Sequence, residues 1–183
     1  EGLLEILSKK YSSQNDDIKK EIEKFSDTVA DEIPIVIMGT YSSGKSAFIN
    51  ALIGAEVLPS ATTTTTAKTH RIRKSSSSKT GKLSFTYDGV DVLILFNENN
   101  LEVKTTSENE FCSNLYSLIM ENSKDNSIES HIYQALKQLN EQDITDSREK
   151  NKSHLSDLIE LEIPSKNGIF SDKKYNFSVL DAP

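Results

Sequence analysis

The chain has 183 residues, enough to bury the core of a single domain, and a formal net charge of −7. An acidic chain of this kind does not favour nucleic acid as a partner. Its single cysteine, Cys112, excludes an internal disulfide and indicates a reducing compartment, so we expect a cytoplasmic protein. No apolar run approaches the roughly 20 residues that a membrane-spanning helix needs, which leaves peripheral attachment at the inner face of a membrane open.

Residues 1–32 predict an N-terminal helical segment. Ile18, Ile22, Phe25 and Val29 recur at helical spacing, and charged residues fill the other face. Two interpretations are open. The helix either packs on the flank of the domain that follows, or it is one arm of a helical bundle that further chain beyond the C-terminus completes.

Residues 39–46 read Gly-Thr-Tyr-Ser-Ser-Gly-Lys-Ser, which is the P-loop pattern. An apolar run at 35–38 precedes it and a helix pattern follows. This is the strand, glycine-rich turn and helix of a P-loop, and the agreement of all three argues against a chance match. We expect Gly39 and Gly44 to adopt backbone angles that side chains forbid, so that the N–H groups of the turn bind phosphate oxygens. Lys45 would supply charge to the β and γ phosphates, and the Ser46 hydroxyl would ligate Mg²⁺.

The next predicted element is a switch loop over about residues 57–67. It contains five consecutive threonines, and a hydroxyl near the γ phosphate would complete the Mg²⁺ shell. The alternative is a β-branched lead-in to the strand expected over 68–74, and both interpretations can hold. Serines 75–78, between basic residues, predict a solvated hairpin tip, with contact to an acidic partner or lipid headgroups as the alternative.

A β-hairpin is predicted next, because the alternating residues up to Tyr87 meet an apolar strand at 90–96 through Asp88-Gly89. Residues from about 97 to 157 are polar with two helical patterns, and we interpret them as a helical insertion. His131 and His154 have no partners at metal-ligand spacing, so no zinc site is expected.

The chain closes on an apolar strand over residues 177–183 that ends in Asp181, after an alternating strand at 159–163. An apolar strand that ends in an aspartate is the Walker B arrangement, in which the carboxylate holds Mg²⁺ through a water. The chain does not begin with Met and stops at Pro183, so we expect both ends to be cut points.

These residues together resemble the dynamin superfamily of large GTPases, with the bacterial dynamin-like proteins and mitofusins most similar. The resemblance is carried by residues 39–54, by Val-Leu-Pro at 57–59, by Thr-Thr-Ala at 65–67 and by Asp-Ala-Pro at 181–183. The family motif at the last of these reads Asp-x-Pro-Gly, so the chain stops one residue short of the glycine. The resemblance implies an α/β fold of the P-loop NTPase class with three αβα layers, as an incomplete G domain over residues 33–183, truncated after the Walker B strand.

The resemblance also implies the chemistry of the site. GTP and Mg²⁺ would be the cofactors, and Thr66 falls at the family's distance from the P-loop lysine for the switch threonine. Ser42 would contact the β–γ region and a monovalent cation, K⁺ or Na⁺, and Tyr41 would lie near the face at which two G domains meet. The implied catalytic residues are Ser42, Lys45 and Thr66, and the metal residues are Ser46, Thr66 and Asp181. The residues expected to contact nucleotide are Gly39, Tyr41, Ser42, Ser43, Gly44, Lys45, Ser46 and Ala47.

The function implied by the resemblance is GTP hydrolysis coupled to G-domain dimerisation and membrane remodelling, with membrane contact through the missing C-terminal region. The chain has no Asn/Thr-Lys-x-Asp motif for guanine. GTP is therefore an inference from resemblance, and an ATP-binding member of the superfamily is an alternative. A monomeric GTPase switch that binds an effector and a scaffold with a vestigial P-loop are the others. We expect weak nucleotide binding and weak or no hydrolysis from this chain alone, which should expose a parallel edge strand.

Overall fold

The computed structural model describes residues 32–39, 43–59, 68–98, 100–150, 153–164, 167–172 and 175–182. The helical segment predicted over 1–32 lies outside them except for its last residue. The described strands are β1 (Glu32–Ile37), β2 (Thr69–Lys74), β3 (Thr80–Tyr87), β4 (Val90–Asn97), β5 (Asn100–Thr105), β6 (Leu158–Ile163) and β7 (Asn176–Asp181). The described helices are α3 (Lys45–Ile53), α4 (Glu110–Asn122), α5 (Ile128–Lys150) and the short 3-10 helix η1 (Gly168–Ser171).

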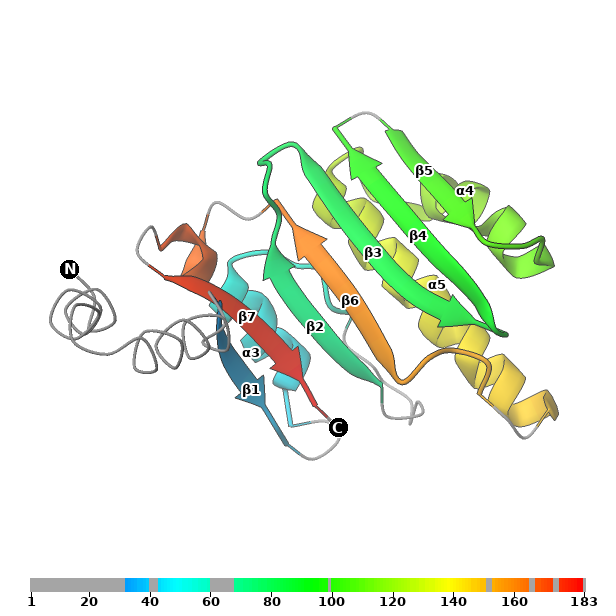
Figure 1. The fold of residues 1–183 in the computed structure, drawn as a ribbon, viewed down its shortest axis with the longest axis horizontal. Helices are drawn as coiled ribbons and strands as arrows, with labels where there is room; N and C mark the ends of the chain where they lie inside the picture. The colour runs from blue at the N-terminus through cyan, green and yellow to red at the C-terminus, as the bar shows by residue number, and fades with distance from the viewer. Residues whose placement is uncertain are drawn as a thin grey trace, which may run out of the picture. The chain divides into compact units, whose positions relative to one another are not determined.

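The described strands form one sheet in the order β1-β7-β2-β6-β3-β4-β5 (Figure 1). Strand β7 is antiparallel to β2, and β2 is parallel to β6. The remaining pairs, β6 with β3, β3 with β4 and β4 with β5, are antiparallel. Strands β1 and β7 run in the same direction in Figure 1, and the N–H of Ala182 donates to the carbonyl of Ile37 at 3.0 Å. The predicted P-loop strand and Walker B strand are therefore neighbours whose carboxyl ends meet at one edge.

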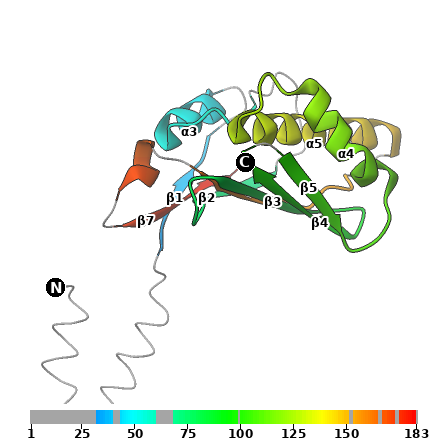
Figure 2. The ribbon, with the colours of Figure 1, turned by 90° about the horizontal axis from the view of Figure 1, so that it is seen from above.

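Helices α3, α4 and α5 lie over one face of the sheet (Figure 2). The alternation of burial along β3 is consistent with helices on one face, because successive side chains of a strand point to opposite faces. The residues on the helix side are buried and the alternate residues are half-buried; the buried ones are Gly81, Leu83, Phe85 and Tyr87. The α/β P-loop class expected from the sequence is confirmed. Among the described residues, α3, α4 and α5 form one helical layer of this fold. None of these helices is long and apolar enough to cross a membrane.

Two details of the predicted topology are wrong. Strands β2 and β3 do not form a hairpin, because β6 lies between them and pairs with both. The connecting residue Ser75 is buried and its N–H donates to the carbonyl of Ile163 at 2.8 Å, so this segment passes over the end of β6, while Ser76 and Ser78 are exposed as expected. The start of the predicted helical insertion is the strand β5, which alternates in burial because it pairs with β4. The hairpin through Asp88-Gly89 is confirmed, and both residues have positive φ.

A buried polar cluster attaches α5 to the sheet. The hydroxyl of Tyr87 donates to Asp146 at 2.5 Å, and Gln142 donates to the other carboxylate oxygen at 3.2 Å. Burial, followed by the hydrogen bond and charge of Asp146, raises the pKa of Tyr87 above its usual value. One turn away, Ser153 donates to Asp143, and the Lys68 ammonium donates to Ser153 at 2.7 Å. The insertion is thereby bound to the first residue that the structure describes after the threonine run.

Candidate nucleotide-binding site

The turn before α3 shows why its second glycine is needed. Gly44 precedes the helix with φ 83° and ψ 15°, in the left-handed region, and its carbonyl accepts from the N–H of Phe48 at 2.9 Å. Gly39 does not have a positive φ, so the expectation of a forbidden angle is wrong there. A Cβ on Gly39 would instead approach the Ser43 hydroxyl to 3.0 Å, a tight contact that requires the serine side chain to shift.

The ammonium of Lys45 joins the two ends of the site. It donates to the carbonyl of Ala182 at 2.8 Å and to that of Gly39 at 3.3 Å, and it lies 3.6 Å from Oδ1 of Asp181. These groups belong to the first turn of α3, the start of the glycine-rich turn and the end of β7. The fold therefore brings the predicted P-loop lysine and the predicted Walker B aspartate together from positions far apart in sequence.

Asp181 is a buried carboxylate, with 11% of its side chain exposed. Its Oδ1 has no hydrogen-bond partner within the described residues. Its Oδ2 lies 3.6 Å from Nδ1 of His70, which occupies the directly opposite position on β2. A buried carboxylate oxygen without a donor is expensive unless a bound group satisfies it, so the site suits a cation or its water ligand.

The residues present fit a nucleotide-bound Mg²⁺. Mg²⁺ prefers hydroxyl and carboxylate oxygens and keeps several waters or phosphate oxygens, so one serine and one aspartate are a sufficient protein contribution. Ser46 stands in the first turn of α3 next to Lys45, which contacts the Asp181 carboxylate. Within the described ranges there is no group of three or more His, Cys, Asp or Glu that could hold a metal by itself.

Asn50, which was not identified from the sequence, binds the backbone of the segment that follows α3. Its side chain accepts from the N–H groups of Val57 at 3.2 Å and Leu58 at 2.9 Å, and it donates to the Leu58 carbonyl at 2.9 Å. The first residues of the predicted switch loop are therefore buried and attached to the helix. A polar residue within the apolar run Phe-Ile-Asn-Ala-Leu was the available signal.

The structure places the described members of the predicted site on one turn and one strand end. Lys45 contacts both Gly39 and Asp181, and Ser43, Gly44, Ser46 and Ala47 lie on the same turn or in the first turn of α3. Tyr41, Ser42 and Thr66 lie outside the described residues, so their predicted roles stay predictions. His70 was missed, because its relation to Asp181 depends on the pairing of β2 with β7.

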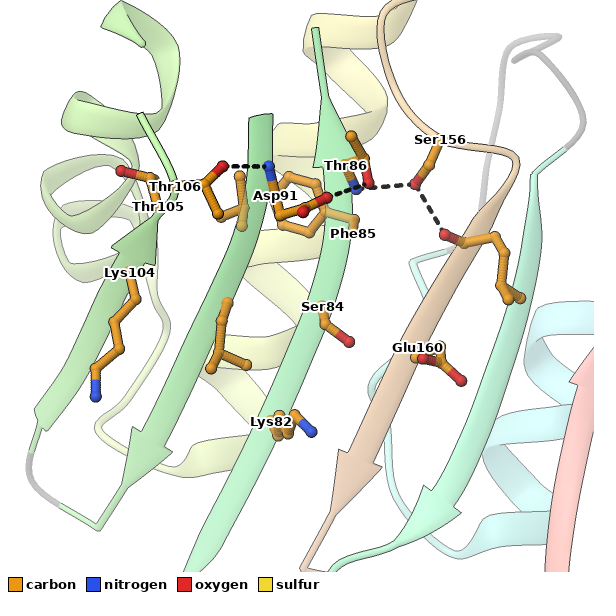
Figure 3. Close-up of a pocket in the computed structure, with 13 residues that line it drawn as sticks. Lys82, Ser84, Phe85, Thr86, Asp91, Lys104, Thr105, Thr106, Ser156 and Glu160 are labelled. Atoms are coloured by element: carbon orange, nitrogen blue, oxygen red, sulfur yellow. Dashed lines mark hydrogen bonds between the residues drawn. The ribbon is translucent and has the colours of Figure 1, made fainter. Parts of the chain in front are cut away.

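A hollow of about 670 Å³ lies elsewhere, on the sheet face opposite the helices (Figure 3). Lys82 and Lys104 line it and pair with Glu162 at 3.5 Å and Glu102 at 3.4 Å. None of the residues that line the hollow belongs to the glycine-rich turn or to the end of β7. It is not the nucleotide site that the sequence predicts.

Two known proteins are similar to this chain. Dynamin-like protein A of Bacillus subtilis (strain 168) is 39% identical over 74 residues, which are 40% of this chain and 6% of that protein. A solved chain from an oligomerised bacterial dynamin pair, described as a mechanism for long-range sensing and tethering of membranes, aligns with a TM-score of 0.44 and 16% identity. That alignment covers 98% of this chain and 23% of the other. The chain thus spans a small part of both proteins.

The sequence profile described as the dynamin family matches residues 35–183, from the middle of β1 to the last residue. The match includes the glycine-rich turn, Lys45 and Asp181, the residues that the fold brings together. The chain therefore belongs to the dynamin family.

Proposed function

We propose that this chain forms the nucleotide-binding part of a dynamin-like GTPase, which binds GTP with Mg²⁺ and hydrolyses the β–γ phosphoanhydride bond. The observation that carries the proposal is the convergence of Gly39, Lys45 and Asp181, with a buried carboxylate oxygen that has no hydrogen-bond partner among the described residues. Family membership supports the same chemistry.

In this proposal, the N–H groups around Gly44 bind the phosphates at the start of α3, where the helix dipole adds positive potential. The Lys45 ammonium exchanges its carbonyl acceptors for β and γ phosphate oxygens. Ser46 and Asp181 would be the residues that hold Mg²⁺, which when bound would supply positive charge to the phosphates. We assign the second hydroxyl of the metal shell to Thr66.

Hydrolysis in this site is an in-line displacement. A water oxygen forms a bond to the γ phosphorus, the bond from that phosphorus to the bridging oxygen breaks, and the water proton leaves with phosphate or solvent. We assign to Ser42 the contact with the bridging region and with K⁺ or Na⁺, and to Tyr41 a place at the dimer face. The work of the chain is positioning and charge stabilisation rather than covalent catalysis.

We further propose that hydrolysis is coupled to dimerisation through the nucleotide face and to membrane remodelling in the cytoplasm, at the inner face of a membrane. In the protein at its full length, specific activity should then rise with protein concentration. A GTPase rate independent of concentration, with a protein that stays monomeric on a GTP analogue, would favour the monomeric switch instead.

The first test is nucleotide binding by the protein at its full length, with fluorescent GTP and ATP analogues. Lys45→Ala should weaken GTP binding about 10- to 100-fold, because hydrogen bonds to charged groups contribute about 1.5–3 kcal/mol. Lys79→Ala is the matched control, since its side chain is 70% exposed and its ammonium lies 3.5 Å from Glu98. Unchanged binding in Lys45→Ala would support the scaffold, and preference for the ATP analogue would support the ATP-binding alternative.

A further inference from the structure

His70 faces the Walker B aspartate across the sheet. The two residues are direct partners in the antiparallel pairing of β2 with β7, so their side chains leave the sheet on the same face. The distance from Nδ1 of His70 to Oδ2 of Asp181 is 3.6 Å. The other carboxylate oxygen, Oδ1, lies 3.6 Å from the ammonium of Lys45. The carboxylate therefore stands between an imidazole and an ammonium, each facing a different oxygen.

The imidazole is available to the carboxylate. The His70 side chain is 13% exposed, and its Nδ1 is a buried atom without a hydrogen-bond partner among the described residues. Buried polar atoms in folded proteins are nearly always paired. Closing the contact to the usual length of about 2.9 Å requires a shift of less than about 1 Å. No other described side chain forms an ion pair with Asp181 besides those of His70 and Lys45.

We infer that His70 is a positioning residue, whose imidazole donates its Nδ1–H to Oδ2 of Asp181 and so orients Oδ1 toward the nucleotide side of the site. This inference rests on the proposed function, in which Oδ1 accepts from a water ligand of Mg²⁺. The pairing of β2 with β7 would then serve to place His70 beside Asp181. When Lys45 turns to the phosphates, His70 is the group that still holds the carboxylate in its orientation.

The inference predicts a change in the magnesium requirement of nucleotide binding. His70→Leu should raise the Mg²⁺ concentration for half-maximal binding of a fluorescent GDP analogue about tenfold, the lower end of the range for outer-shell partners of metal ligands. Binding in EDTA should change less than about twofold, because Asp181 acts on the metal and not on the phosphates. His70→Gln, which keeps an N–H donor, should bring the Mg²⁺ concentration for half-maximal binding most of the way back to the wild-type value. The rate constant kcat should fall with little change in KM.

His154→Leu is the matched control, because His154 also faces an aspartate, with Nδ1 2.9 Å from Oδ1 of Asp88, but lies outside the site. An unchanged magnesium requirement in His70→Leu, an equal loss of binding in EDTA, or no rescue by His70→Gln would overturn the inference and leave the proposed function standing. A wild-type protein that binds no nucleotide at any magnesium concentration would overturn both.

A measurement on the wild-type protein covers the case in which His70→Leu does not fold. Nitrogen NMR of the histidine-labelled protein reports which ring nitrogen carries the proton. The inference requires the Nδ1–H tautomer at His70. A neutral ring with its proton on Nε2 would overturn it, because that ring has no donor for Asp181.

Discussion

Two glycines of the described chain have similar positive φ angles in different settings. Gly44, at φ 83°, begins the helix after the predicted phosphate-binding turn, and Gly89, at φ 77°, closes the hairpin between β3 and β4. A Cβ on either would meet no atom of the described residues within 4 Å, so an alanine at these positions is opposed by backbone strain. Comparing the two positions separates the effect of a positive φ on stability from its effect on nucleotide binding.

Gly44→Ala and Gly89→Ala should therefore each lower the free energy of unfolding by about 1–2 kcal/mol, the cost of a left-handed conformation for a residue with a Cβ. Only Gly44→Ala should also weaken nucleotide binding, because relief of the strain tilts the N–H groups that face the phosphates. Urea denaturation and fluorescent-nucleotide titration measure the two effects. Equal nucleotide affinity in both variants would contradict the role given to the turn.

At the scale of elements, α5 packs its first turn against β3. A Cβ on Gly81 would come within 2.9 Å of Ile128 and 3.1 Å of Ile132, so strand and helix are in close contact there. His131, between these two isoleucines, is 1% exposed, and neither ring nitrogen has a hydrogen-bond partner within the described residues. Burial lowers the pKa of His131, and the charge of Asp125 offsets part of that effect.

Acid should for this reason destabilise the protein through His131. The unfolded chain takes up a proton below about pH 6.5, while the buried ring in the native state resists protonation, so the free energy of unfolding falls as pH decreases from about 7 to 5. His131→Leu should reduce this dependence, and at pH 7 it should be neutral or stabilising because it removes two unsatisfied polar atoms.

Urea midpoints at the two pH values measure the effect. His131→Gln is the control, since an amide cannot take up the proton but keeps a buried polar group. It should flatten the pH dependence without the gain in stability. An undiminished pH dependence in both variants would place its origin elsewhere.

At the scale of the whole molecule, β1 forms one edge of the described sheet. Apolar side chains are exposed at this edge and on the adjoining helix, with Val36 51%, Met38 73% and Phe48 57% exposed. An open edge strand presents unpaired backbone N–H and carbonyl groups, and natural proteins normally cover or charge such edges. The parallel edge strand expected from the sequence agrees with the position of β1 in the sheet.

These 183 residues expressed by themselves should therefore associate through β1. Val36→Lys should weaken the association about fivefold, because a charge at the edge opposes pairing by about 1 kcal/mol. Leu158→Lys is the control, since Leu158 is 40% exposed on β6, an interior strand. Light scattering after size-exclusion chromatography measures the mass. Equal effects of both substitutions would point to general charge repulsion instead of edge pairing.

The local features of the fold were predictable from the sequence because each depends on neighbouring residues. The glycine-rich turn, the hairpin at Asp88-Gly89 and the strand that ends at Asp181 all follow from spacing over a few positions. The strand β5 was missed, because six residues at the start of a polar segment carry too little alternation to be separated from the helices that follow. Its conformation depends on its pairing with β4.

The sequence by itself determined which chemical groups the site contains: a lysine and a serine at the start of a helix and a carboxylate at the end of an apolar strand. Only the tertiary structure decided how these groups meet, and that β6 separates β2 from β3. It also decided that His70 stands opposite Asp181. The physical reason is that the register between paired strands brings together residues more than a hundred positions apart. That register depends on which faces of the sheet are buried.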